Sequence, residues 1–308
     1  MMNYPENSVL NSDISDLHEP VLVNEVLDNL NPAEGGIVVD ATLGMAGHSQ
    51  AILERFPRIA CLIGMDRDGE ALELAAQRLS PWRKKVALFH CNFAEMADIL
   101  QAEGITGVDA ILIDLGISSY QLEQSGRGFS FRRDEPLDMR MDRFSSIMAA
   151  DLVNQLPKEK LEELILAYGE ERWAAKIAWA IERSRQQAPI LTSRELASIV
   201  EEAIPRRFHP KKIHPATKTF QALRIAVNRE FENLKKVLDE APDCLKPGGR
   251  ILIISFHSLE DRLVKQGFRD DERLEVLTKK PIRPSAAETA INPRARSAKL
   301  RIAQRRAA

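Results

Sequence analysis

The sequence has 308 residues, of which 44% are hydrophobic and 29% are charged, with a formal net charge of −2. These values are typical of an ordinary globular protein with one large or two medium domains. No apolar run approaches the ~20 residues that a membrane helix needs, and the polar, acidic residues 1–16 do not form a signal peptide. Three scattered cysteines exclude a disulfide framework. We therefore expect a cytoplasmic protein that does not bind a membrane.

Strand-like apolar runs that end in an acidic residue recur in the first part of the chain. GIVVD ends at Asp40, ACLIGMD at Asp66 and VDAILID at Asp114, and the run VALFH lies between the last two. Helical patterns from Asp68 and Phe93 separate these runs, so that strands and helices alternate. This order predicts an α/β fold with a doubly wound, mostly parallel, Rossmann-like sheet.

The alternation stops after Asp114. A long segment with three glycines, residues 115–143, is followed by purely helical patterns over 147–204. The α/β pattern returns with a helix over about 216–238, a turn at LKPGGR, the strand ILIISF, and two further strand candidates, RLEVLTK and SAKLRIAQ. We predict an inserted helical domain over 144–214, within a discontinuous α/β domain formed by 1–143 and 215–308.

The stretch DATLGMAGHS, from Asp40, joins the first strand to a helix through a glycine turn. Gly44 and Gly47 allow backbone N–H groups to approach a ligand closely. Asp66 ends the second strand 22 residues after Gly44, where a carboxylate can accept hydrogen bonds from ribose hydroxyls. The combination favours an adenosine-containing cofactor over glycines that serve only the geometry of the turn.

The turn has neither the G-x-G-x-x-G pattern of nicotinamide sites nor the Lys-Ser/Thr ending of a P-loop. S-adenosylmethionine fits better, because it has a ribose and an adenine but no phosphate. Phe93, after the third strand, is placed either to pack against the adenine or to face the core. No HxxH, HExxH or CxxC pattern is present, so we expect no metal.

Eight stretches of the sequence carry a resemblance to a known family. They are HEPVLVNEVL, DATLGMAGHS, GMDRD, DLGISSYQLEQSGRGFSFRRDEPLDMRMD, YGEERWAAKIA, HPATKTFQALRIAVNREF, KPGGRILIISFHSLEDR and NPRARSAKLRIA. Through them almost the whole chain resembles the ribosomal RNA small subunit methyltransferase H family, which methylates N4 of a cytosine in 16S rRNA with S-adenosylmethionine. The resemblance implies an α/β methyltransferase with a helical insertion for RNA recognition, and 16S rRNA or the small ribosomal subunit as partner.

The resemblance also implies which residues contact the cofactor. They are Ala46, Gly47 and His48 in the glycine turn, Asp66 at the ribose, Phe93 at the adenine, and Asp114 and Gln121. Ala46 departs from the family, which usually has glycine there. If this position needs a positive φ, alanine costs about 1 kcal/mol.

Methyl transfer to N4 of cytosine needs an acceptor that holds an amino proton, because the nitrogen lone pair is delocalised into the ring. Asp114, at the end of the fourth strand, is the candidate acceptor, and binding of the cofactor alone is its alternative role. His257, just after ILIISF, is a second catalytic candidate. A structural hydrogen-bonding role is the alternative for His257.

Two segments are candidates for RNA contact. Residues 205–227 carry six basic residues and no acid, among them Arg206, Arg207, Lys211, Lys212 and Lys218. The segment GRGFSF offers Arg127, Phe129 and Phe131 for stacking and phosphate contact. The alternatives are a solvated surface for the first segment and a hairpin anchored to the core for the second. Trp173 and Trp179 are expected to pack within the insertion.

Three other functions compete with rRNA methylation. A methyltransferase of DNA or of a small molecule would share the cofactor site. A nicotinamide-dependent oxidoreductase would use the same strand-turn-helix unit, and a nonenzymatic RNA-binding protein would need only the basic surfaces. The missing G-x-G-x-x-G spacing disfavours the oxidoreductase.

Overall fold

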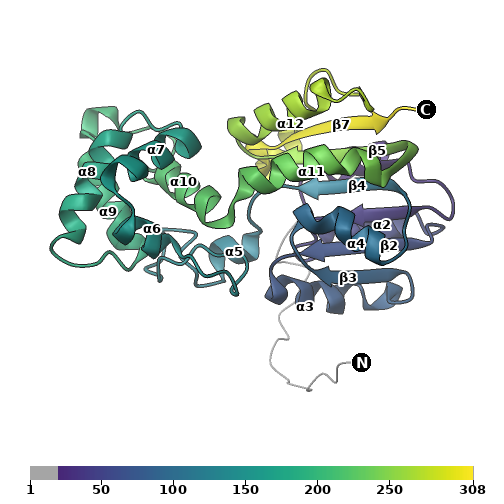
Figure 1. The fold of residues 1–308 in the computed structure, drawn as a ribbon, viewed down its shortest axis with the longest axis horizontal. Coiled ribbons are helices and arrows are strands. Elements are labelled where there is room, and N and C mark those ends of the chain that lie inside the picture. Colours follow the sequence, from purple (N-terminus) through teal and green to yellow (C-terminus); the bar gives the residue numbers. More distant parts are fainter. Residues whose placement is uncertain (1–19, 308) are drawn as a thin grey trace.

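The computed structural model describes residues 20–307. His18, which opens the motif HEPVLVNEVL, lies outside the described residues. Figure 1 shows two parts, a sheet covered by helices and a group of helices beside it. The long helices α10 (Thr217–Asn228) and α11 (Glu230–Cys244) connect the two parts.

The seven strands of the sheet follow the order β3-β2-β1-β4-β5-β7-β6. Strands β1 to β5 pair in parallel, and β7 runs antiparallel to both β5 and β6. The predicted mostly parallel, doubly wound sheet is therefore confirmed. The strands are β1 (Ile37–Asp40), β2 (Cys61–Asp66), β3 (Val86–His90), β4 (Val108–Asp114), β5 (Leu245–Ser255), β6 (Leu274–Val276) and β7 (Lys299–Arg305).

Both faces of the sheet are buried, because successive side chains of a strand point to opposite faces and helices cover each face. Val38 and Leu62 belong to one core cluster, whereas their neighbours Val39 and Ile63 belong to the other. This explains why the strands are almost continuously apolar. The helices of this part are α1 (Val23–Leu30), α2 (Gly47–Arg55), α3 (Gly69–Arg78), α4 (Met96–Ala102), α11 (Glu230–Cys244), α12 (Ser258–Asp270) and α13 (Ala286–Ile291).

A third core cluster holds the helical part together and contains residues from Phe129 to Val227. This cluster includes residues on both sides of the predicted range 144–214. The helices of the helical part are α6 (Ala149–Gln155), α7 (Lys158–Gly169), α8 (Ala174–Arg185), α9 (Ser193–Ala203) and α10 (Thr217–Asn228), and the short α5 (Ser119–Glu123) precedes it.

The single helix predicted over about 216–238 is wrong, because the chain breaks it at Arg229, whose φ is +51°. The Asn228 side chain stabilises the break: its amide nitrogen donates to the carbonyl of Met139, and its oxygen accepts from the amide of Met141. The predicted turn LKPGGR also differs, since it forms the beginning of β5 with an irregular register to β4.

Within residues 20–307, no helix is both long enough and apolar enough to cross a membrane.

Candidate active site

The glycine turn begins where β1 ends at the buried Asp40. The Ser49 hydroxyl donates to the Asp40 carboxylate at 2.7 Å. Burial raises the pKa of Asp40 to about 6, although the bond from Ser49 opposes the shift. Gly44 has a φ of +51°, a conformation that costs glycine little, and its amide donates to Asp66 at 2.7 Å. The turn is therefore fixed at both ends by carboxylates.

Asp66 connects the turn to the end of β2. One carboxylate oxygen accepts from the Gly44 amide, and the other accepts from the Asp68 amide at 2.8 Å. Burial raises the pKa of Asp66, and these two backbone hydrogen bonds oppose the rise. A carboxylate has about four acceptor positions, so Asp66 retains capacity for a ligand.

Ala46 adopts a φ of +61° as the residue before α2. The suspected strain is thus present, but the Ala46 side chain is fully buried and does not line the cavity described below. At the next position, a Cβ on Gly47 would lie 3.0 Å from the Pro20 ring. Residues Ala46 and Gly47 therefore shape the turn mainly through backbone conformation and close packing.

Ala46→Gly is expected to change the free energy of unfolding by less than about 1 kcal/mol. Relief of the left-handed conformation, about 1 kcal/mol, is offset by the loss of a buried methyl group, about 0.8 kcal/mol. Urea denaturation measures the difference. A stabilisation above about 2 kcal/mol would contradict this balance and show that the turn is strained well beyond Ala46.

A cavity of about 480 Å³ lies against the carboxyl ends of the parallel strands. Its lining includes most of the predicted cofactor residues, namely Gly47, His48, Asp66, Phe93, Asp114 and Gln121. Gln121 is held in place by donating to Asp68 at 2.9 Å. The structure therefore brings together residues that are far apart in the sequence.

Sequence reasoning missed several residues of the same cavity. They come from α10, from the start of α11, from the segment after β5 and the first turn of α12, and from the C-terminal region: Thr217, Arg224, Glu230, Phe231, Phe256, Glu260, Arg294 and Ser297. Most of them fall in the motifs HPATKTFQALRIAVNREF and SFHSLEDR. The match of these motifs to the family could have indicated a functional role, but the sequence did not show that their side chains line the cofactor cavity.

Asp114 ends β4 at this cavity, and its backbone amide donates to the Thr42 hydroxyl at 2.6 Å. The Oδ2 atom lies 3.7 Å from Nε2 of His48. The Oδ1 atom is buried and, among residues 20–307, has no hydrogen-bond partner. Burial, followed by the negative charges of Asp40 and Glu260, raises the pKa of Asp114 well above its ordinary value. Asp114 is thus a basic carboxylate with a free acceptor oxygen.

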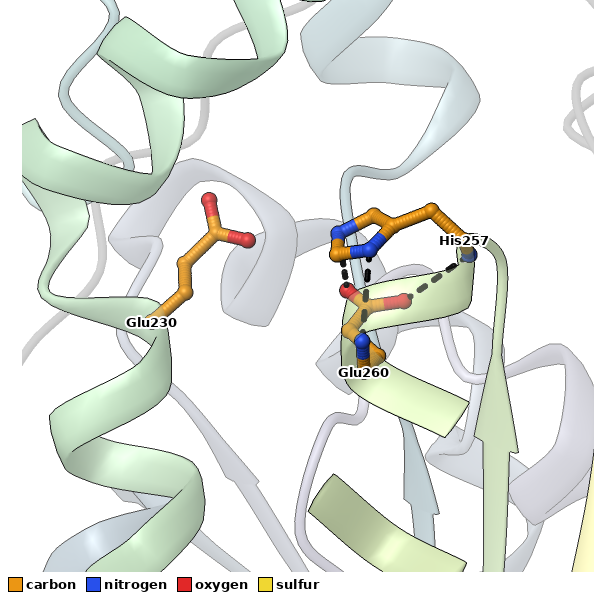
Figure 2. A group of neighbouring side chains, drawn as sticks. All are labelled: Glu230, His257 and Glu260. Carbon is orange, nitrogen blue, oxygen red and sulfur yellow. Dashed lines mark hydrogen bonds and ion pairs between the residues drawn. The ribbon is translucent and has the colours of Figure 1, made fainter. Parts of the chain in front are cut away.

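His257 lies beside Glu230 and Glu260, and Figure 2 shows their arrangement. The amide of Glu260 donates to Nδ1 of His257, which caps α12, and Nε2 lies 3.1 Å from the Glu260 carboxylate. Nδ1 therefore has a hydrogen-bond partner, whereas Nε2 lies beside the Glu260 carboxylate and, among residues 20–307, is buried without a hydrogen bond. These contacts fit the structural hydrogen-bonding role considered for His257. To transfer a proton, His257 would have to give up one of them.

The same three side chains offer ligand atoms within 4.8 Å of one another, close enough to hold one cation. Arg224, however, donates to both carboxylate oxygens of Glu230 at 2.8 and 2.9 Å. It also lies 4.0 Å from Glu260, and together with His257 it lowers the pKa of Glu260. The arginine supplies the positive charge that a metal would bring, so this cluster is balanced as an ion-pair network.

The three RNA candidates of GRGFSF have partners inside the protein. Arg127 is 2% exposed and pairs with Asp68 at 2.6 Å, and Phe129 is buried in the core of the helical part. Phe131 packs against the rings of His214 and Phe220. The hairpin interpretation thus fits this segment better than RNA contact, because neither Arg127 nor Phe129 presents an accessible surface.

Arg127→Gln should lower the free energy of unfolding by about 3 kcal/mol, because Asp68 would stay buried without its cation. The neighbouring Arg132 is exposed, so Arg132→Gln is the matched control and should change stability by less than about 0.5 kcal/mol. Chemical denaturation compares the two. Equal stabilities would show that the Arg127 ion pair contributes nothing to the fold.

The basic candidates of residues 205–227 are placed differently from one another. Arg206, Arg207, Lys211 and Lys212 are exposed. Lys218 instead donates to the carbonyl of Glu170 at 2.8 Å, at the end of α7. Four of the five predicted side chains are therefore exposed, and Lys218 is half-buried.

Comparisons with known proteins agree on one family. The model of the MraW methylase family matches residues 15–306. A protein named ribosomal RNA small subunit methyltransferase H from Syntrophus aciditrophicus is 48% identical over 306 residues, covering 94% of this chain and 97% of that protein. The protein of the same name from a Cyanothece species is 51% identical over 289 residues, with 94% and 95% covered. The chain therefore belongs to the MraW methylase family.

Proposed function

We propose that this protein transfers a methyl group from S-adenosylmethionine to N4 of a cytosine in 16S ribosomal RNA. The observation that carries the proposal is the single cavity lined by both Asp66 and Asp114, in a chain that is about half identical to proteins named as methyltransferases of small-subunit rRNA. A cytoplasmic location follows from this substrate.

The cavity residues fit S-adenosylmethionine. Asp66 keeps acceptor positions for ribose hydroxyls beside its two backbone bonds, and Phe93 offers a ring for the adenine. The glycine turn lacks the lysine that a triphosphate would require. When bound, S-adenosylmethionine supplies a methyl group on positively charged sulfur, so no covalent enzyme nucleophile is needed.

Asp114 is the residue we assign to the reacting amine. Its unpartnered Oδ1 can accept a hydrogen bond from the N4 amino group and hold the proton that leaves as positive charge develops on nitrogen. A raised pKa makes this carboxylate a better proton acceptor than an exposed aspartate. Its neighbour His48 limits where the carboxylate can turn.

A paired cytosine cannot present its amine, so the base must be unpaired or rotated out of its helix. The cavity is lined from one side by the sheet and from the other by Thr217 and Arg224 of α10. We propose that the base enters between the two parts of the molecule. The exposed Arg206, Arg207, Lys211 and Lys212 would then contact phosphates of the surrounding RNA.

The test is transfer of labelled methyl from S-adenosylmethionine to small subunits and to protein-free 16S rRNA that lack the modification, with the product mapped by mass spectrometry. The expected product is a single N4-methylcytidine. Label on another base, or none on RNA, would contradict the proposal. A rise in melting temperature with NAD but not with S-adenosylhomocysteine would favour the oxidoreductase instead.

A further inference from the structure

One face of α8 is exposed, basic and aromatic. Arg172, just before the helix, is followed by Lys176, Trp179 and Arg183, at spacings of four, three and four residues that place them on the same side. All four are exposed, and Trp179 retains 53% of its accessible surface. The opposite side of α8 is buried in the helical core. The expectation that Trp179 packs within the insertion is therefore wrong.

A second aromatic group extends this face toward η4 (Arg206–Phe208). The rings of Trp173 and Phe208 are 5.2 Å apart. Arg172 lies 5.6 Å from the first ring centre and 5.3 Å from the second, and Lys176 lies 4.9 Å from the Trp173 ring. Arg183 lies over the Trp179 ring in the same way, 5.4 Å from its centre. Cations and aromatic rings thus alternate across the surface.

The cations of this face have no acidic partners in the part of the chain that the structure describes. Arg172, Lys176 and Arg183 form no ion pair with Asp or Glu there. The contrast is clear on neighbouring surfaces, where Lys160 pairs with Glu163 at 2.7 Å and Arg185 with Glu182 at 4.0 Å. The positive charge of the α8 face is therefore available to an external anion.

We infer that this α8 surface, formed by Arg172, Trp173, Lys176, Trp179, Arg183 and Phe208, binds an unpaired stretch of the substrate RNA. Cations that hold a phosphate backbone and exposed rings on which bases stack are the two elements of single-strand recognition. A protein partner would need an acidic surface, and would not need the exposed ring of Trp179 between two cations. The inference rests on the proposed function.

The position of α8 adds a spatial consequence. Figure 1 shows α8 on the side of the helical part that faces away from the sheet, whereas α10 faces the cavity. RNA held by α8 is therefore separate from the base that enters the cavity. The α8 surface should contribute to RNA affinity and leave cofactor binding and the chemical step unchanged.

The test measures the affinity for protein-free 16S rRNA over a range of KCl concentrations. The slope of log K against log salt is negative, and the triple variant Arg172→Gln/Lys176→Gln/Arg183→Gln should make it shallower by about 2. Each phosphate contact in single strands contributes about 0.7 to its magnitude. Trp179→Ala should weaken binding roughly tenfold with an unchanged slope, because it removes stacking and no charge. Single-turnover rates at saturating RNA should stay at the wild-type value for both.

The matched control neutralises three cations that already pair with acids, Lys158, Lys160 and Arg269. This control should reduce the magnitude of the salt slope by less than the α8 triple variant does. Equal slopes for the two triple variants would overturn the inference. It would also be overturned if the α8 variants lost binding to assembled subunits but not to protein-free RNA, because that result would indicate a protein partner. If the wild-type protein neither binds nor methylates rRNA, the proposed function fails too.

Discussion

Asp66→Asn should weaken the binding of S-adenosylmethionine roughly a hundredfold, because hydrogen bonds to a charged group contribute about 1.5–3 kcal/mol each. In the structure both carboxylate oxygens already accept backbone hydrogen bonds, from Gly44 and from Asp68. An asparagine NH2 group would face one of these N–H donors. The substitution therefore removes acceptors for the ribose and also shifts the glycine turn.

Titration calorimetry with S-adenosylmethionine and S-adenosylhomocysteine measures the loss, and Asp98→Asn, an exposed acid on α4, is the control. Since burial raises the pKa of Asp66 and the ligand needs its ionised form, wild-type affinity should fall as pH is lowered toward that pKa. An unchanged affinity in the folded Asp66→Asn variant would exclude Asp66 from the cofactor site.

The sheet was predictable because its signals are local. Each buried strand is a short apolar run, and Asp40, Asp66 and Asp114 mark three strand ends that parallel pairing brings to one edge. The glycine turn after the first strand follows from the same pattern. The cofactor side of the cavity could therefore be assembled from the sequence.

The remaining features depend on distant partners. Arg127 was predicted to contact RNA because it is a cation beside two phenylalanines, and nothing local indicates Asp68, its partner 59 residues away. The break at Arg229 has neither glycine nor proline, and it is stabilised by Asn228 reaching residues 87 and 89 positions away. Side chains that cap or pair over such distances leave no periodic signal.

Trp179 was predicted to be buried and is exposed, whereas Arg127 was predicted to be exposed and is buried. An apolar residue on an amphipathic helix is usually assigned to the core, but its position between Lys176 and Arg183 places it on the polar face of α8. Helical spacing alone contained this information.

Asp114→Asn should lower the single-turnover rate of methyl transfer roughly a hundredfold or more, the usual contribution of a positioned general base. The amide keeps the size of the side chain and one acceptor oxygen, but it cannot take a proton or balance positive charge on N4. An interaction made mainly in the transition state is lost, so the affinities for S-adenosylmethionine and RNA should change little.

The variant also has a predictable stability. Burial and the charges of Asp40 and Glu260 raise the pKa of Asp114, so the folded state holds the proton more tightly than the unfolded state. That contribution to stability is complete below the unfolded pKa and is lost as pH rises through the folded pKa. Asparagine does not titrate, so at neutral pH Asp114→Asn should be at least as stable as the wild type, and a slow rate cannot be attributed to unfolding.

The pH profile separates the two roles of Asp114. A proton acceptor must be ionised, so the wild-type single-turnover rate at saturating cofactor and RNA should rise with pH through the raised pKa and then level off. The Asp114→Asn rate should lack this rise. If Asp114 only binds the cofactor, the variant should bind S-adenosylmethionine more weakly and methylate at a near-normal rate once saturated. Single-turnover rates measured beside both dissociation constants decide the matter, because a normal saturated rate excludes Asp114 as the acceptor of the N4 proton.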